Sequence, residues 1–124
     1  MLENMEEGTL LVSFSDEEAK LKRIKKYASE LVRFTDGMNF EAYQNNVQVN
    51  YACAFALLQI GAIGNRLDSE LQLKLEIPWS AVIAARNASL HGHTMSHKKI
   101  IWDEIQKIST LLLRLEELVE GCSK

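Results

Sequence analysis

Proline and glycine are scarce in this sequence, whose 124 residues include one proline and six glycines. Strand patterns are rarer still, because the only short alternating stretch lies at residues 12–14 and is too short to build a sheet. With few turn-forming residues and no run of strands, a sheet-based fold is excluded. Helical periodicity dominates the chain instead.

Cysteine and long apolar runs are also in short supply. The two cysteines, Cys53 and Cys122, are too few for a disulfide framework, which favours a reducing cytoplasm. The acidic N-terminus, residues 1–7, is unlike a secretory signal. The longest weakly polar run, residues 51–64, is interrupted by Gln59 and falls short of the ~18 apolar residues of a membrane helix. We therefore expect a cytoplasmic protein that has no membrane partner.

The composition, 47% hydrophobic and 25% charged, is that of one folded domain. A net charge of -3 excludes a strongly basic, histone-like nucleic-acid binder but leaves room for a local basic site. One such cluster, between Lys20 and Lys26, is either a phosphate-binding patch or, as we favour, a solvated helix face. We expect an acidic arm at residues 1–14, a helical bundle domain at 15–120 and a tail at 121–124.

Four main helices are predicted, and together they form an all-α antiparallel bundle. The first follows a capping box, in which Ser15 is the N-cap and Glu18 lies three residues later, and it ends near Gly37. The second runs from about residue 45 to residue 67, and the third lies between Pro78 and Gly92. The last covers residues 98–118. Short extra helical turns are expected near residues 39–43 and 71–75.

Apolar stripes predict which side of each helix faces the core. On the first helix the stripe is Leu21, Ile24, Ala28 and Leu31. On the second it is Val47, Tyr51, Ala54, Phe55, Leu58 and Ala62. The last helix carries a heptad-like seam of Ile101, Ile105, Ile108, Leu112, Leu115 and Val119.

The second helix is also nearly free of charge, since Arg66 is the only charged residue between positions 42 and 66. A helix that is apolar all round is usually buried on more than one side. In a domain this small, the second side is expected to be an oligomer interface, so we predict a two-fold homodimer.

The residues that indicate chemistry lie in one segment, residues 77–102, which contains no Asp or Glu. An acid-free stretch that carries Arg, Lys and all three histidines of the chain favours an anionic ligand such as phosphate. Trp79 and Trp102 flank the segment, either as platforms for bases or, more commonly, as core anchors. The cations and imidazoles of the segment are Arg86, His91, His93, His97, Lys98 and Lys99.

Arg86 and His91 are five residues apart, which is about 140° around a straight helix. They meet only if the helix loosens before Gly92, or if a two-fold partner supplies a second copy to a shared groove. Together they suit RNA cleavage by the neighbouring 2′-OH, which needs a proton acceptor, a proton donor and a cation for the developing charge. His91 would transfer protons and Arg86 would stabilise the phosphate. This chemistry requires no metal and no cofactor.

Three further residues are candidates for substrate binding. Asn87 either contacts the RNA or steadies the helix end with a hydrogen bond. His93 and Lys98 are placed to bind phosphate. The histidine spacing, His91-x-His93 and His93 to His97, can bind zinc, but Gly92 interrupts the helix and no acid or Cys lies close in sequence. We therefore predict no metal site.

The helical pattern, the Ile77-Pro78-Trp79 helix start and the Arg86-x-x-x-x-His91 motif resemble the HEPN domains, and among them the HepT-like toxins. The similarity covers about residues 21–118 and includes the segments 57–61 and 100–103. It implies an all-α bundle that dimerises with its Arg and His motifs in a shared cleft, and metal-independent endoribonuclease activity. It also implies a minimal nucleotidyltransferase antitoxin that holds the toxin inactive.

Two residues depart from the family pattern. His93 stands where the family often has a tyrosine, whose hydroxyl the antitoxin can adenylylate, and Ala62 stands where the family tends to carry Glu. The departures keep an alternative open, in which the protein is a non-catalytic module that binds a nucleotide or a nucleotidyltransferase without cutting RNA.

Overall fold

The structure is a computed structural model that describes the backbone of residues 2–123 and the side chains of residues 16–120. The side chains of the expected acidic arm, of the expected N-cap Ser15 and of the tail lie outside this range. The bounds of the first helix include Ser15, so this helix does not begin at the predicted capping box.

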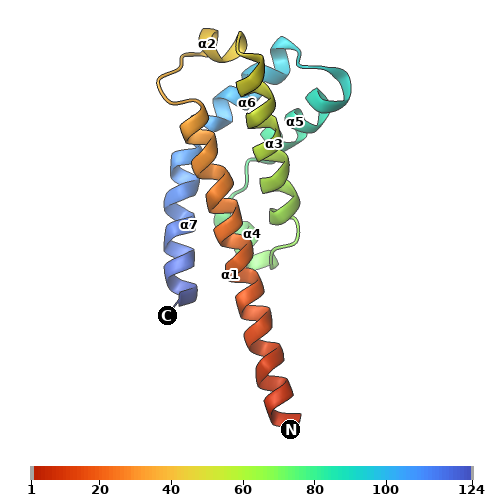
Figure 1. Cartoon of the computed structure of the whole chain (residues 1–124), viewed down its shortest axis with the longest axis vertical. Coiled ribbons are helices and arrows are strands. Elements are labelled where there is room, and N and C mark those ends of the chain that lie inside the picture. The colour runs from red at the N-terminus through yellow and green to blue at the C-terminus, as the bar shows by residue number, and fades with distance from the viewer. Residues whose placement is uncertain (1, 124) are drawn as a thin grey trace.

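Across its described residues the chain forms helices and no strands, which confirms the all-α prediction (Figure 1). The short helices α2 and α4 match the two extra turns expected from the sequence. The helices are α1 (Leu2–Phe34), α2 (Phe40–Gln44), α3 (Val47–Gly64), α4 (Ser69–Leu75), α5 (Trp79–His91), α6 (Met95–Ile105) and α7 (Ile108–Ser123).

Local chemistry explains most of the helix ends. The chain turns after α1 at Gly37, whose φ of 75° lies in the left-handed region that favours glycine. Asn46 caps α3, because its side-chain oxygen accepts from the backbone N–H of Val49 at 3.1 Å. Pro78 precedes α5 and Gly92 follows it with a φ of 86°, as the sequence predicted.

The prediction of a single last helix from residue 98 to residue 118 is wrong. The helix is interrupted at Gln106 and Lys107, between α6 and α7. There the N–H of Lys107 bonds the Glu104 carbonyl at 3.0 Å, an i to i−3 bond typical of a tight turn. The break lets α6 pack against α5 while α7 packs against α1. The predicted heptad-like seam continues across the break, since Ile105 and Ile108 are both buried.

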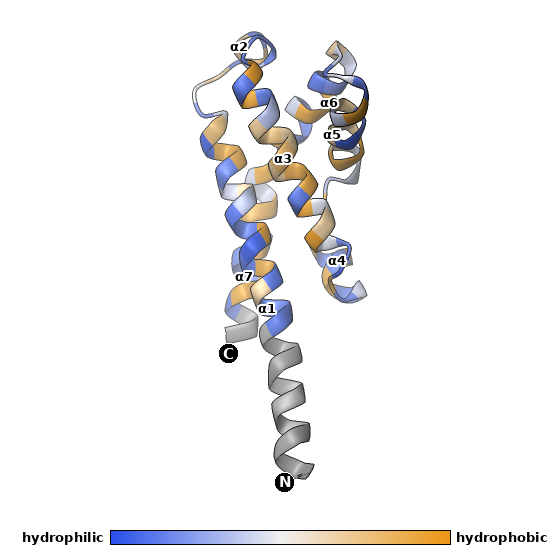
Figure 2. Cartoon of the chain, turned by 45° about the vertical axis from the view of Figure 1, so that its right-hand side comes forward, coloured by the Kyte–Doolittle hydropathy of each residue, from blue (hydrophilic) through white to orange (hydrophobic). Residues whose placement is uncertain are grey.

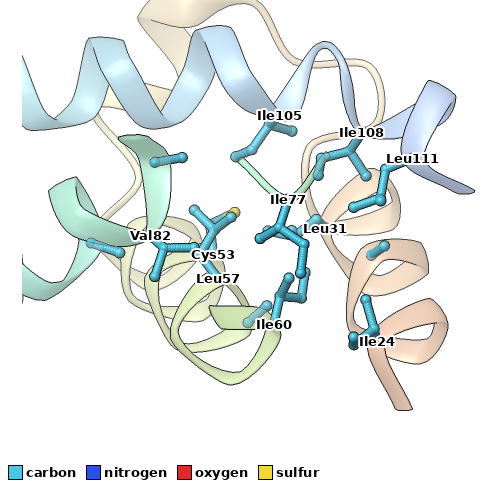
Figure 3. Packing of buried hydrophobic residues seen from close by; sticks show 14 of the residues in the cluster. Ile24, Leu31, Cys53, Leu57, Ile60, Ile77, Val82, Ile105, Ile108 and Leu111 are labelled. Carbon is cyan, nitrogen blue, oxygen red and sulfur yellow. The ribbon is translucent and has the colours of Figure 1, made fainter. Parts of the chain in front are cut away.

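The bundle has two connected halves (Figure 1). α1 packs against α7 and α3, and α3 packs in turn against α5. Figure 3 shows the core where these helices meet: Ile77, which precedes α5 in the chain, lies between Val82 and Leu57 on one side and Ile24 of α1 on the other. This contact fixes α5, the helix that carries Arg86 and His91.

The predicted core face of α3 is only partly right. Ala54 is buried and Leu58 packs against the core, as predicted. Val47, Tyr51 and Phe55, however, are 58%, 61% and 56% exposed. The inward side carries small residues, and Gly61 lies so close to Val82 that a Cβ at this position would overlap the valine. Close approach rather than side-chain size therefore decides which side faces inward. The buried residues of α3 are Asn50, Cys53, Ala54, Ala56, Leu57, Ile60, Gly61, Ile63 and Gly64.

Hydropathy distinguishes α3 from α1 (Figure 2). By length and composition alone, α3 is apolar enough to cross a membrane, which corrects the expectation that no run is long enough. Half of it, however, is buried inside the bundle, as in the core helix of a soluble protein. α1 alternates apolar and charged residues, and all four residues of its predicted stripe are buried.

Candidate functional site

Arg86 and His91 both lie on α5, which remains helical through His91. Loosening before Gly92, one of the two ways to bring them together, is therefore ruled out within this chain. At ~100° per residue the two side chains leave the helix about 140° apart, with Ile83 and Leu90 between them on the solvent side. Both Arg86 and His91 are exposed.

Arg86 lines a hollow of about 350 Å³ between α3 and α5. The α3 side of the hollow is small and uncharged, with Gly61, Ala62 and Asn65. Trp79 and Ile83 of α5 complete it, so the guanidinium has an aromatic ring and an open space beside it. The hollow has no acidic lining residue, which suits an anionic ligand. His91 does not line this hollow.

Beyond Gly92 the chain turns back toward α3 and brings His93 against Tyr51. The two ring centroids are 5.1 Å apart, with the planes tilted by 57°. The Nδ1 atom of His93 is buried and has no hydrogen-bond partner. Burial lowers the pKa of His93, and the positive charges of Lys98 and His97 act in the same direction. His93 is therefore neutral at neutral pH.

His93 shares a second cavity, of about 480 Å³, with Lys98. Lys98 is held in place by a 3.1 Å hydrogen bond that its Nζ donates to the Gln44 carbonyl oxygen. Ser89 also borders the cavity, but its hydroxyl donates to the Ala85 carbonyl at 3.0 Å and so continues the helix bonding. Two predicted substrate-binding residues thus meet here, whereas Asn87 is exposed on α5 and lines neither cavity.

Among residues with described side chains, no group of three or more His, Cys, Asp and Glu is close enough to hold a metal ion. His97 turns its Nδ1 toward the Gly92 carbonyl oxygen at 3.4 Å. His91, His93 and His97 consequently do not form the three-nitrogen cluster that their spacing suggested.

The model of a known family, described as Ribonuclease HepT-like, matches residues 24–119. This range covers α3, α5 and both cavities, and it is well over half of the chain. The chain belongs to the HepT-like ribonuclease family. Membership of this ribonuclease family identifies RNA as the substrate class, and it confirms the resemblance seen in the sequence.

Relatives of this HepT-like protein carry ribonuclease names. "Putative RNase MJ1380" of Methanocaldococcus jannaschii is 24% identical over 97 residues, covering 77% of this chain and 89% of the relative. "Putative RNase MJ1216" of the same organism is 24% identical over 111 residues, covering 86% and 92%. No solved structure matches the chain significantly.

Sequence reasoning missed two residues of the cavity in this HepT-like chain. Tyr51 was placed on the core stripe of the second helix, but it is 61% exposed and its ring lies against His93. Asn50 is 1% exposed, and its Nδ2 donates to the carbonyls of Tyr43, Gln44 and Asn46, which leaves Oδ1 without a partner. An amide side chain in an otherwise apolar helix is the sequence signal that could have identified Asn50 as a residue of the cavity. Trp102, by contrast, is buried against Tyr43 and serves the core.

Proposed function

We propose that this protein is a metal-independent endoribonuclease toxin of a toxin–antitoxin pair, in which Arg86 and His91 act on RNA in a cleft shared by two copies. Membership of the HepT-like ribonuclease family supports the nuclease, and the Arg86-x-x-x-x-His91 motif lies inside the matched range. The observation that carries the proposal is the position of Arg86 and His91 on opposite edges of an exposed apolar strip of α5.

The proposed reaction is an attack of the ribose 2′-OH on the adjacent phosphorus. His91 accepts the 2′-OH proton or gives a proton to the departing 5′ oxygen, and Arg86 stabilises the charge that develops on the phosphorane. The P–O5′ bond breaks, so the products are a 2′,3′-cyclic phosphate and a 5′-hydroxyl. The planar fork of Arg86 suits two phosphate oxygens at once.

The proposed homodimer explains how residues 140° apart serve one site. Exposed apolar side chains gather on α3 and α5, where a second copy would remove them from water. A two-fold axis beside α5 would bring Arg86 of each copy toward His91 of the other. The exposed apolar side chains of this face are Val47, Phe55, Trp79, Ile83 and Leu90, whereas the exposed ring of Tyr51 lies against His93.

We assign substrate binding to Asn87, His93 and Lys98. Asn87 follows Arg86 on the exposed part of α5, and a side-chain amide there can bond a phosphate or a base edge. Lys98 and neutral His93 share the cavity beside the end of α5. These residues should influence substrate affinity more than the rate of bond cleavage.

The proposed partner is a minimal nucleotidyltransferase antitoxin, as the family resemblance implies. His93 has no hydroxyl group, so an antitoxin that adenylylates a tyrosine two residues after the motif histidine finds no acceptor here. Inhibition should then require binding. An adjacent gene for a small nucleotidyltransferase, and toxicity of this chain that its product relieves, would support the pair.

Purified protein and a substrate with 2′-deoxyribose at the scissile position provide the main test. RNA should be cut with and without a chelator, leaving a 2′,3′-cyclic phosphate, and the deoxy substrate should stay intact. Equal cleavage of the two substrates would mean that the attacking group is not the 2′-OH.

Mixing two inactive variants tests the shared cleft. When Arg86→Ala and His91→Ala proteins exchange subunits, each mixed dimer has one site with both residues intact, so activity should recover to at most about a quarter of the wild-type value. If Arg86 and His91 of the same copy act together, no intact site forms and the mixture stays inactive.

A non-catalytic module is the second candidate, favoured by Ala62 and His93 at two positions where the family differs. Under it, the purified protein binds a nucleotide or its nucleotidyltransferase partner and leaves RNA uncut in the same assay.

A further inference from the structure

The cavity beside His93 has two kinds of wall. One is apolar and aromatic, made by Tyr51, Phe55 and neighbouring residues of α3. The other is polar and basic, made by His93 and Lys98 after α5. None of the lining residues is an Asp or Glu, and a volume of about 480 Å³ is within the range of small-molecule sites.

We infer that this cavity is a base-binding subsite, in which Tyr51 and His93 hold one unstacked nucleobase of the RNA and Lys98 binds an adjacent phosphate. The inference rests on the proposed function, because it adds a specificity pocket to the same site. It assigns a role to Tyr51, which neither the motif nor the family match singles out.

Tyr51 offers the stacking surface. Its ring contacts His93 on one side, and the residue is nevertheless 61% exposed, so part of the ring is open to a ligand. Proteins recognise single-stranded RNA by stacking unpaired bases on such rings and by hydrogen bonds to the base edges. Because Nδ1 of His93 is buried, Nε2 is the ring nitrogen left for a base edge, where a neutral imidazole offers one hydrogen bond.

Lys98 offers the charge. One of the three donors of its ammonium is used on the Gln44 carbonyl, which fixes the group and leaves two donors for phosphate oxygens. Asn50 lies in the wall below, fixed by three carbonyl acceptors, with Oδ1 unpartnered. Its orientation is certain because only the amide nitrogen can donate to those carbonyls.

The subsite and the proposed catalytic hollow both lie between α3 and α5. α3 and its C-cap Asn65 contribute residues 47–58 to the cavity and 61–65 to the Arg86 hollow, while α5 contributes 88–89 and 79–86 respectively. A strand lying between α3 and α5 can therefore place a phosphate at Arg86 and a neighbouring base against Tyr51.

The test measures binding of an oligoribonucleotide whose 2′-OH groups are replaced by fluorine, so that it cannot be cut by 2′-OH attack. Tyr51→Leu keeps apolar area and removes the ring, so the dissociation constant should rise roughly ten- to a hundredfold, whereas Tyr51→Phe should bind almost normally. Lys98→Gln should weaken binding and reduce the slope of log K against log salt by about 0.7. Leu113→Ala, on the exposed side of α7, is the remote control.

Three results would overturn the subsite: Tyr51→Leu binding as well as wild type, Tyr51→Leu losing affinity only together with its dimer mass in sedimentation, and Tyr51→Phe losing as much as Tyr51→Leu. Free AMP provides a further arm. Binding of AMP as tightly as the oligonucleotide, with the same dependence on Tyr51, would assign the cavity to a mononucleotide rather than to an RNA strand.

The subsite and the nuclease can fail separately. Cleavage by wild type with no effect of Tyr51→Leu on binding or rate rejects the subsite alone. Binding that depends on Tyr51 without any cleavage rejects the nuclease and keeps the subsite in a non-catalytic module. A protein that neither binds nor cuts rejects both.

Discussion

The α1–α7 half and the α3–α5 half of the bundle expose different kinds of side chain to solvent. On α1, the exposed side is charged and internally paired, with Lys20 bonded to Glu17 at 2.9 Å and Lys22 to Glu18 at 3.2 Å. On α3 and α5 the exposed side is largely apolar, and its nearby cations face no acid. The exposed apolar side chains of α3 and α5 are the basis of the proposed homodimer, and the cations beside them are the basis of the proposed RNA site.

The largest expected effect is a loss of RNA cleavage when site residues of α5, but not an exposed cation of α1, are replaced. His91→Ala should lower the rate of RNA cleavage by about 10²–10⁴, since it removes general acid–base catalysis. Arg86→Ala should also lose most activity, and Arg86→Lys should restore little, because an ammonium lacks the bidentate fork. Arg23→Ala, an exposed cation of α1, is the matched control. A similar loss for Arg23→Ala in cleavage assays would break the distinction between the halves.

The next effect concerns assembly. Ile83 on α5 is 52% exposed and Leu113 on α7 is 63% exposed, so the monomer alone tolerates a charge at either position. Ile83→Glu should halve the mass measured by sedimentation and abolish cleavage, because it buries a carboxylate in the proposed dimer face. Leu113→Glu should change neither. If both the Ile83→Glu and the Leu113→Glu variants remained dimeric, the apolar strip of α5 would not be the interface.

A smaller effect should appear in stability. Gly61→Val inserts a branched side chain against Val82, and overpacking of this kind costs about 1–3 kcal/mol. Ala19→Val, at an exposed position of α1, should cost only about 0.7 kcal/mol in helix propensity. Urea unfolding of both variants gives the difference. Equal midpoints would mean that α3 and α5 can move apart freely.

The smallest effect is a dependence on pH. Well above the ordinary pKa of 6.5, His93 is neutral in both the folded and the unfolded chain and does not change the free energy of unfolding. As the pH falls through 6.5, the unfolded chain binds the proton first, because burial lowers the folded pKa of His93. The free energy of unfolding therefore falls, until the pH is below the folded pKa as well.

His93→Asn should remove this part of the pH dependence. Thermal unfolding of wild type and His93→Asn between pH 5.5 and 7.5 would measure the difference between their free energies of unfolding, which should narrow at lower pH. A difference that stays constant over that range would indicate that His93 has an ordinary pKa.

Sequence patterns predicted α1 well and α3 poorly for one physical reason. α1 has charged residues that mark its solvent side, so the inward stripe from Leu21 to Leu31 follows directly. α3 is apolar all round and gives no such mark. Its inward side is set by how closely α5 can approach at Gly61, which is a property of two helices together.

The site divides in the same way. Spacing along α5 was enough to predict that Arg86 and His91 do not share one face of a straight helix, because helical angles are local geometry. It left helix loosening and a two-fold partner as open alternatives. The meeting of Tyr51 with His93 depends on the turn at Gly92 and on the packing of α3, so no single segment of sequence contains it. The break at Gln106 was hidden because the apolar spacing continues across it.

One glycine of α3 also constrains how this protein can change over generations. Gly61 leaves no room for a Cβ beside the branched side chain of Val82, so these two residues share one volume, whereas a Cβ at Gly64 meets the terminal Cδ1 of Ile77, which can rotate away. A larger residue at position 61 is tolerable only with a smaller one at 82. Among relatives, this pair should therefore covary in size, and a lineage that altered one member alone would shift α5 and with it Arg86.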